Sequence, residues 1–273
     1  MSPFKSVVGF ILSIMMLAAL PGQAAAASCG NDGSGFGPWL ADFKAQAAGA
    51  GISRRTLDTA LGNIGYSRKV ISLDRNQKAF NMSFDEFMNL RAPAYFVTKG
   101  KKIIQQNASM LNSIERRYGV QKEILVAIWG METGFGANSG SMNVFQSLAT
   151  LAYDCRRSAF FAEELMAALA IVDRGDMSAS QMRGAWAGEI GQTQFLAKNY
   201  LRFAVDGDGD GRRDLIRSRA DVLASTANFL HAHGWRPGAD YQPGQPNFGV
   251  LQQWNKAAIY QKALAVFAGR LAS

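Results

Sequence analysis

Residues 124–136 read ILVAIWGMETGFG, an apolar run that ends in a glutamate, two glycines and a phenylalanine. Ile124, Ile128 and Glu132 recur every four residues, so they share one face of a helix that begins near Gln121. A carboxylate at the end of an apolar stripe loses hydration, which raises its pKa toward the range of a general acid. The two glycines let the backbone approach a ligand closely, and Phe135 offers a stacking face. Spacing alone leaves two interpretations of Glu132 open: a catalytic acid, or a helix-end residue paired with a base.

The remainder of the chain predicts a mainly α protein with little sheet. Alternating β-branched runs are scarce, and 48% hydrophobic with 18% charged residues is the composition of a folded protein. We expect helices over 39–48, 53–61, 80–90, 101–117, 121–131, 158–172 and 219–233, and a final helix or two over 251–271. Ser53 is predicted to be an N-cap, Gly119 to end the fourth helix, and Ser178 with Gln181 to form a capping box that opens a short helix. Residues 184–194, 206–214 and 234–249 are expected to be turns or loops.

The first 27 residues have the pattern of a secretory signal peptide. Lys5 precedes an apolar stretch from Val7 to Leu20, and small residues follow up to Ala27. The apolar stretch is shorter than the about 20 residues of a membrane-spanning helix. We therefore expect residues 28–273 to be exported to the periplasm as a soluble protein.

The chain has two cysteines, Cys29 and Cys155. Export to an oxidising compartment favours a disulfide between them. So long a loop is worth up to about 4–5 kcal/mol in the chain-entropy model. The alternative is a lipid anchor on Cys29. Residues 26–28 lack the leucine expected three positions before a lipidated cysteine, and lipidation would leave Cys155 unpaired, so we expect the disulfide.

The chain is basic, with a formal charge of +8 that becomes +7 when Lys5 is removed with the signal peptide. A positive exported protein could bind nucleic acid, anionic lipid or an acidic polymer. No basic run is interleaved with aromatic residues in the way that follows a phosphate backbone, so nucleic acid is not an expected partner. Peptidoglycan carries lactyl and peptide carboxylates, and it fits the charge equally well.

Several kinds of catalytic chemistry are disfavoured by the residues present. His231 and His233 are the only histidines, and neither a G-x-S-x-G nor an H-E-x-x-H motif occurs. Two histidines spaced i, i+2 on a helix do not share a face, which makes a poor zinc site. We expect both at a helix C-terminus before Gly234. Carboxylate chemistry remains.

A series of further motifs surrounds the opening stretch. They are Tyr118-Gly119-Val120, GMETGFG at 130–136, QSLATLAY at 146–153, Arg156-Arg157, Phe160-Phe161, Glu164-Leu165, Trp186-Ala187-Gly188, GQTQF at 191–195, Val205-Asp206, ANFL at 227–230, His233-Gly234-Trp235 and Trp254-Asn255. In this order the chain resembles the B-type lytic murein transglycosylases over roughly residues 39 to 260. Each motif alone is a weak signal, but together they are specific.

The resemblance implies a lysozyme-like helical catalytic core over residues 116–236. It also implies an additional helical region built from residues 28–115 and from a C-terminal segment, 237–273, that packs back on the cleft. Glu132 is the implied single catalytic carboxyl. It would protonate the glycosidic oxygen between N-acetylmuramic acid and N-acetylglucosamine, and then draw a proton from the muramoyl 6-hydroxyl as a 1,6-anhydro ring closes. No water is consumed and no second carboxylate is needed.

The resemblance further implies peptidoglycan glycan strands as the partner and no cofactor for catalysis. A monomer is expected, and proteins of the cell-wall machinery are further candidate partners. The positions that match substrate-binding residues of the family are Gln194, Asn255, Tyr260, Phe87, Phe160 and Phe229. At the three phenylalanines the family pattern has tyrosine, so a ring face remains while a hydroxyl contact is lost. Plain core packing is the alternative for each of these three.

Two residues depart from the family pattern. Ala185 stands where relatives often carry serine, so one polar contact near the catalytic acid is missing. Glu189 stands at a position that is usually small and apolar, and as a second cleft carboxylate it would allow a hydrolytic muramidase that uses Glu132 and Glu189. A surface or ion-paired Glu189 is the other interpretation. A non-catalytic protein that binds the cell wall is a third alternative for the whole chain.

The segment from Asp206 to Asp214 follows the EF-hand calcium loop at positions 1, 3, 5, 6 and 9. The bidentate acid of position 12 is absent, because Arg217 stands there. The family has a comparable loop with a later aspartate, for which Asp221 is the nearest match. The sequence leaves open a structural calcium site, formed by Asp206, Asp208, Asp210 and Asp221, or a turn without metal.

Overall fold

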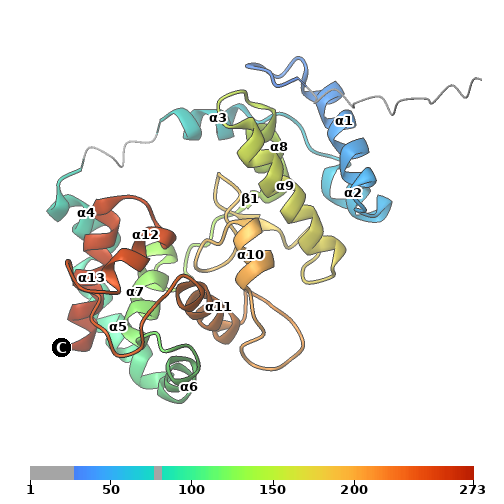
Figure 1. Ribbon diagram of the computed structural model, residues 1–273. Coiled ribbons are helices and arrows are strands. Elements are labelled where there is room, and N and C mark those ends of the chain that lie inside the picture. Colours follow the sequence, from blue (N-terminus) through green and yellow to red (C-terminus); the bar gives the residue numbers. More distant parts are fainter. Residues whose placement is uncertain (1–27, 77–81) are drawn as a thin grey trace, which may run out of the picture.

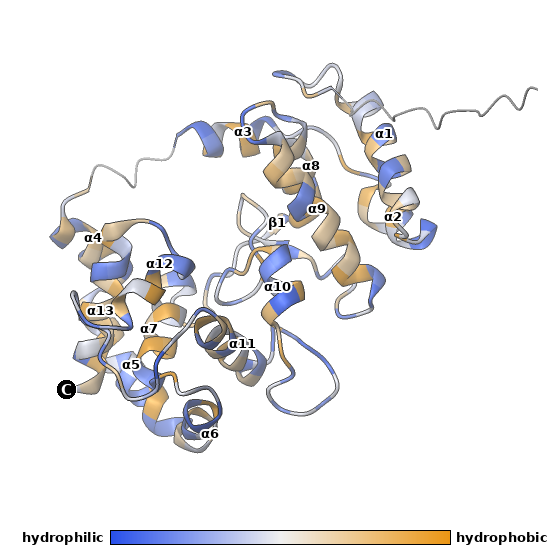
Figure 2. Cartoon of the chain, viewed as in Figure 1, coloured by the Kyte–Doolittle hydropathy of each residue, from blue (hydrophilic) through white to orange (hydrophobic). Residues whose placement is uncertain are grey.

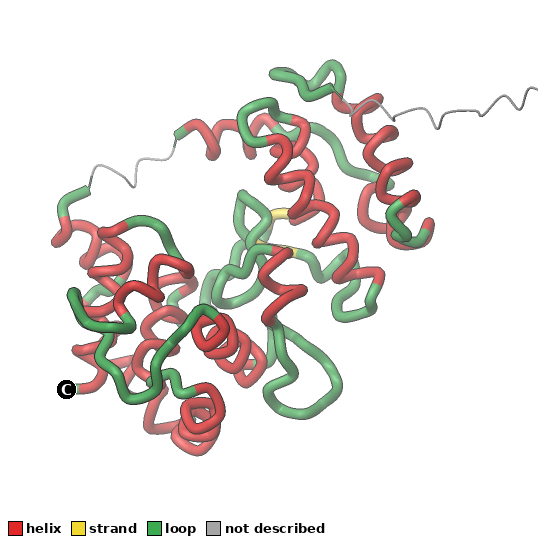
Figure 3. Tube along the Cα trace, in the orientation of Figure 1, coloured by secondary structure: helices red, strands yellow, loops and turns green. Residues whose placement is uncertain are grey.

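The computed structural model describes residues 28–76 and 82–273, so the expected signal peptide lies outside the described residues (Figure 1). The described chain is mainly helical, which confirms the predicted fold class (Figure 3). Its two named strands, β1 (Met142–Asn143) and β2 (Arg183–Gly184), form one short antiparallel pair. None of the described helices is both long and apolar enough to cross a bilayer.

The helix that contains the opening motif, α7 (Lys122–Thr133), lies at the centre of one group of helices. Every residue from Ile124 to Met131 is buried, which explains why this segment is apolar on all sides. The helices that pack on it are α4 (Phe84–Arg91), α5 (Ala94–Gln106), α6 (Ala108–Tyr118), α11 (Arg219–Ala232) and α13 (Ala258–Ala272).

A second group of helices surrounds α8 (Val144–Tyr153) and α9 (Ser158–Asp173), which pack along each other and are largely hydrophobic (Figure 2). In α8 every side chain except Gln146 is buried. The other members are α1 (Phe36–Gly49), α2 (Arg54–Leu61), α3 (Arg68–Arg75) and α10 (Ala197–Phe203). Residues 28–115 therefore contribute helices to both groups. The turn-rich segment after β2 lies between the groups (Figure 1).

Local signals in the sequence predicted several helix ends correctly. The Ser53 hydroxyl accepts a hydrogen bond from the Thr56 N–H and caps α2. Gly119 ends α6 with a left-handed φ of 70°, a conformation that glycine adopts without a steric cost. The two histidines lie at the end of α11, as expected, where His233 is the C-cap residue.

Other predicted boundaries were wrong. The single helix expected over 101–117 is two helices, because Asn107 ends α5 and starts α6. Its side-chain amide donates to the Ile103 carbonyl at 2.8 Å, which competes with continued helix. Ser178 and Gln181 form a turn rather than a helix start, since both the Ser178 N–H and its hydroxyl donate to the Gln181 side-chain oxygen. Three helices, α3, α8 and α10, were not predicted.

Cys29 and Cys155 form a disulfide across a sequence separation of 126 residues, which confirms the predicted pairing. The bond ties the start of the described chain to the turn between α8 and α9. Next to it, the Gly30 N–H donates to the Tyr153 carbonyl at 2.9 Å. The N-terminal helices are therefore attached covalently as well as by packing.

Replacing both Cys29 and Cys155 with serine is expected to lower the free energy of unfolding by about 2–4 kcal/mol, because the unfolded chain regains the freedom of a long loop. Thermal unfolding of the variant and the oxidised protein measures the difference. Adding reductant to the wild type should give the same decrease, and reductant should not affect the variant. Equal melting temperatures for variant and oxidised protein would contradict a stabilising disulfide.

Candidate active site

A pocket of about 440 Å³ lies between the two helix groups, where the end of α7 meets the turn-rich segment after β2. Its walls also include α11 and the end of α12 (Leu251–Trp254). The residues that line it are Arg91, Glu132, Ala185, Trp186, Glu189, Gln194, Phe195, Leu196, Asn199, Phe229, Trp254 and Asn255. Five predicted site residues are thus brought together: Glu132, Gln194, Asn255, Phe229 and Glu189.

Glu132 is the last residue but one of α7, which ends at Gly134 with a left-handed φ of 62°. Its neighbours Met131 and Thr133 are buried, whereas Glu132 is partly exposed into the pocket. Its Oε1 accepts hydrogen bonds from the Tyr260 hydroxyl at 2.6 Å and from Trp254 Nε1 at 3.1 Å. No lysine, arginine or histidine among residues 28–76 and 82–273 forms an ion pair with Glu132. The interpretation of Glu132 as an ion-paired helix end is therefore not supported.

Burial raises the pKa of Glu132 above its ordinary value. The hydrogen bonds from Tyr260 and Trp254, together with the positive charge of Arg91, lower this pKa by smaller amounts. The carboxyl therefore holds its proton to a higher pH than an exposed glutamate does. Burial and the negative charge of Glu132 raise the pKa of Tyr260 well above its ordinary value, so Tyr260 remains a hydrogen-bond donor.

Tyr260 contacts the catalytic candidate rather than the open pocket. It comes from the first turn of α13, and only 6% of its surface is exposed. Phe87 of α4 packs behind it with the ring centroids 6.5 Å apart, outside the pocket lining. Two of the rings predicted to contact sugars thus lie behind Glu132. Tyr260 is hydrogen-bonded to Glu132, and Phe87 packs on Tyr260. Trp254, which sequence reasoning noted only as part of a motif, is the second donor.

Glu189 lines the same pocket as Glu132. Its carboxylate accepts a hydrogen bond from the Ala187 N–H at 3.1 Å, and it makes no ion pair with any described residue. Burial raises the pKa of Glu189, and the negative charge of Glu132 raises it further. Ala185 donates its N–H to the Glu189 carbonyl at 3.2 Å, so the two departures from the family pattern face each other across one turn.

The remaining residues that were predicted to contact the substrate differ in their position relative to the pocket. Gln194 and Asn255 line the pocket, and Gln194 has a left-handed φ of 56°. Phe229 also lines it, but its ring is 3% exposed and packs edge-on against Trp254 at 5.1 Å. Phe160 is 43% exposed and lies outside the lining. Arg91 lines the pocket and was not predicted, because its place depends on how α4 packs against α7.

Phe135 and Gly136 do not have the roles first expected of them. Phe135 is 8% exposed and packs against Phe96 and Trp129, with ring centroids 5.0 and 5.9 Å away. A Cβ on Gly136 would lie 2.2 Å from Gln192 Oε1. The ring is therefore core rather than a stacking face, and the close backbone approach is to a protein side chain rather than to a ligand.

The predicted calcium residues separate into two sets. Asp206, Asp208 and Asp210 each offer an oxygen within 4.8 Å of the others. Asp221 is fully buried, and its two oxygens accept from the Gly207 and Asp214 N–H groups, each at 2.7 Å. Asp221 therefore links the two ends of the loop through backbone N–H groups, and it is not a member of the acidic cluster. The half-buried carboxylate of Asp206 and the exposed ones of Asp208 and Asp210 are the donors that could hold a hard cation.

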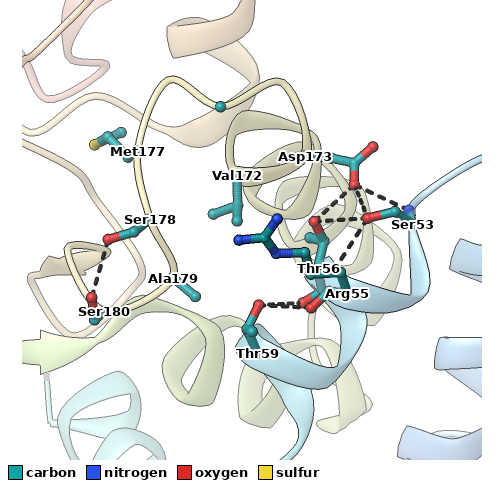
Figure 4. Close-up of a pocket in the computed structure, with 11 residues that line it drawn as sticks. Ser53, Arg55, Thr56, Thr59, Val172, Asp173, Met177, Ser178, Ala179 and Ser180 are labelled. Carbon is teal, nitrogen blue, oxygen red and sulfur yellow. Dashed lines mark hydrogen bonds between the residues drawn. The ribbon is translucent and has the colours of Figure 1, made fainter.

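A second pocket, of about 680 Å³, lies between α2 and the segment that follows α9 (Figure 4). Its single lining carboxylate is Asp173, whose Oδ1 accepts from the hydroxyls of Ser53 and Thr56 at 2.5 and 2.7 Å. These bonds lower the pKa of Asp173, so it remains ionised and is a poor proton donor. Although this pocket is larger, the glutamates whose pKa burial raises line the pocket at the end of α7.

Known proteins resemble this chain in sequence and in fold. The family model of the transglycosylase SLT domain matches residues 35–244. Membrane-bound lytic murein transglycosylase B of Escherichia coli is 35% identical over 159 residues, which cover 55% of this chain and 44% of that protein. The matched stretch is thus less than half of that relative's length.

Solved structures resemble this fold over most of the chain. SltB3 from Pseudomonas aeruginosa, in complex with NAG-anhNAM-pentapeptide, has a TM-score of 0.82 and 31% identity, over 87% of this chain and 80% of that one. Escherichia coli Slt35, in complex with calcium, has a TM-score of 0.76 over 90% of this chain and 96% of that one. At 24% identity the second likeness shows the fold alone.

Proposed function

The chain belongs to the transglycosylase SLT domain family, and we propose that it is a lytic murein transglycosylase that cleaves the glycan strands of peptidoglycan. The observation that carries the proposal is the setting of Glu132. Its carboxyl lines the pocket, has a raised pKa, and accepts hydrogen bonds from two donors on a single oxygen. The bound fragment named for SltB3 contains an anhydro sugar, which is the product expected from this reaction.

We assign both proton transfers to Glu132. Tyr260 and Trp254 donate to Oε1, and no described residue donates to Oε2, which is left to exchange the proton. The protonated carboxyl gives its proton to the glycosidic oxygen as the bond to C1 of N-acetylmuramic acid breaks. The ionised carboxylate then takes the proton of the 6-hydroxyl, whose oxygen bonds to C1 and closes the anhydro ring. The two donors stabilise the ionised form between these steps.

We assign contacts with the sugars to Gln194, Asn255 and Phe229, because these side chains line the pocket around Glu132. Gln194 Nε2 is already bonded to the Gly191 and Ser139 carbonyls, at 2.8 and 3.2 Å. Its Oε1 is left to accept from a sugar hydroxyl or acetamido N–H. Arg91 adds a positive charge to the same pocket, which suits the carboxylates of peptidoglycan.

Hydrolysis by Glu132 and Glu189 is the second candidate, favoured by the presence of both carboxyls in one pocket. In that reaction Glu189 would activate a water that attacks C1. A non-catalytic protein that binds peptidoglycan would retain the pocket without turnover. Digestion of purified peptidoglycan separates these functions. Anhydro ends, lighter by one water, support the transglycosylase; reducing ends would show hydrolysis, and binding without products would show the third function.

We also propose that residues 28–273 act in the periplasm after export. The proposal is supported by the signal-peptide pattern of residues 1–27 and by the disulfide, which suits an oxidising compartment. The mass of the protein recovered from the periplasm tests it. A mass for residues 28–273 less two hydrogens is expected, whereas an acylated N-terminus would indicate a lipid anchor on Cys29.

We propose that Asp206, Asp208 and Asp210 hold a structural calcium ion, which would fix the turn that carries them. Removing calcium with a chelator is expected to lower the melting temperature, and calcium in excess should restore it. At a concentration 100 times the Kd, the gain would be about 2.7 kcal/mol. Asp210→Asn should abolish the response, whereas Asp240→Asn, a loop aspartate elsewhere, should not. Identical melting with chelator and with calcium would contradict the site.

A further inference from the structure

A buried glutamine joins the two segments that carry the pocket's polar side chains. Gln192 is 8% exposed and lies in the turn before Gln194. Its Oε1 accepts from Trp129 Nε1 at 2.9 Å, and its Nε2 donates to the Ile216 carbonyl at 2.7 Å. Its main chain is bonded as well, because the carbonyl accepts from the Thr133 hydroxyl at 2.6 Å. One residue thus makes two hydrogen bonds to α7.

Both contacts on α7 lie next to Glu132. Trp129 precedes Glu132 by one helical turn, and Thr133 follows it directly. The Thr133 hydroxyl also accepts from the Gly136 N–H at 2.9 Å, which fixes the chain as it leaves the helix. Gln192 Oε1 packs so closely on Gly136 that a Cβ there would lie 2.2 Å away. Two side chains that flank Glu132 on α7, those of Trp129 and Thr133, are therefore hydrogen-bonded to Gln192.

The turn that carries Gln194 needs such an attachment. Gln194 has a φ of 56°, and a left-handed conformation costs a residue other than glycine about 1–2 kcal/mol. Two backbone hydrogen bonds between Ile190 and Phe195, at 2.7 and 2.9 Å, close the turn. Gln192 lies between them, and its N–H donates to the Leu215 carbonyl at 2.9 Å. This bond anchors the strained turn to the segment before α11.

We propose that Gln192 is a positioning residue, which sets the distance between Glu132 on α7 and Gln194 on the turn. The inference rests on the proposed function of these two residues. Catalysis depends on such distances, since a misplacement of 1 Å can cost about 100-fold in rate. Gln192 does not line the pocket, so its effect on the reaction would pass through Glu132 and Gln194 alone.

The chain provides a matched control at the other end of α7. Gln121, the N-cap residue of α7, accepts from Trp235 Nε1 at 2.9 Å and donates to the Ala239 carbonyl at 2.9 Å. Its side-chain bonds are thus the same in kind as those of Gln192, but it does not line the pocket. Methionine has a similar length and neither donates nor accepts strongly, so the same substitution removes the same bonds at either end.

We expect Gln192→Met and Gln121→Met to lower the melting temperature by similar amounts. Only Gln192→Met should lower kcat on glycan strands, by about 10- to 100-fold, with a smaller change in KM. Its alkaline limit of activity should also move to lower pH, because a loosened helix end admits water to Glu132 and reduces the effect of burial. A kcat within twofold of the wild type, or an equal loss in both variants, would overturn the proposal.

Two further variants keep the test decisive if Gln192→Met does not fold. Gln192→Asn retains the amide but is one methylene shorter, so both side-chain bonds are weakened rather than removed and an intermediate kcat is expected. Trp129→Phe removes the donor to Gln192, and combining it with Gln192→Asn should cost less than the sum of the two single effects. Additive losses would argue against a shared positioning role. The products that the wild type releases identify the reaction independently. An error in the proposed function would therefore appear in the products, and not in the ratios of variant to wild-type kcat.

Discussion

Glu132→Gln is expected to abolish cleavage of glycan strands, with a fall in kcat of about 10⁴-fold, the upper end of the range for general acid–base catalysis. The loss is large because the same carboxyl is assigned both proton transfers. The glutamine oxygen can still accept from Tyr260 and Trp254, so the pocket should keep its shape. Burial disfavours the ionised carboxylate at this position, and a neutral amide should therefore leave the melting temperature unchanged or raise it. Release of muropeptides, followed by mass spectrometry, measures the rate.

The control for this variant is Glu123→Gln, which removes a carboxylate from the first turn of the same helix. Glu123 lies outside the pocket, and its Oε1 is 3.8 Å from Lys122 Nζ. Loss of this carboxylate should leave kcat unchanged. Loss of a general acid that contributes about 10²–10⁴-fold to the rate leaves at most about one per cent of the activity. Glu132→Gln should therefore retain no more than that. A higher residual activity would show that the assignment of Glu132 is wrong.

Tyr260→Phe is expected to lower kcat by about 10- to 100-fold, because a hydrogen bond to a charged group is worth about 1.5–3 kcal/mol. The hydroxyl donates to Glu132 Oε1 at 2.6 Å and so stabilises the ionised carboxylate that must act as base. This bond also lowers the pKa of Glu132, and its removal raises that pKa further. The acid form then persists to higher pH. The alkaline limit of activity should therefore move upward while the maximum rate falls.

A pH–rate profile of Tyr260→Phe beside the wild type measures both effects. Tyr241→Phe is the matched control, because Tyr241 is a buried tyrosine outside the pocket. It should change neither the rate nor the profile. An alkaline limit that stays in place, or moves downward, would show that Tyr260 does not act through the protonation of Glu132.

Features that depend on neighbouring residues were predicted from the sequence. The apolar run of residues 124–136 predicted α7 and placed Glu132 at its end, because helical spacing depends only on the local chain. The N-cap at Ser53 and the left-handed Gly119 also follow from short-range rules. Because the chain has two cysteines and a predicted signal peptide, the disulfide could be predicted from their number and the expected compartment. The family motifs added the expectation that Glu132 is the catalytic residue.

The tertiary structure decided which residues contact Glu132. Tyr260 and Trp254 lie 128 and 122 positions further along the chain, and no periodicity links residues so far apart. The same is true of Arg91, which reaches the pocket through the packing of α4, and of Gln192, whose partners lie about 60 positions back on α7. Packing also moved Phe135 into the core and Asp221 beneath its loop. The sequence by itself thus determined α7 and the position of Glu132 at its end. The donors, the second carboxyl in the pocket and the attachment of the turn were determined only by folding, because burial and hydrogen bonding depend on which distant segments meet.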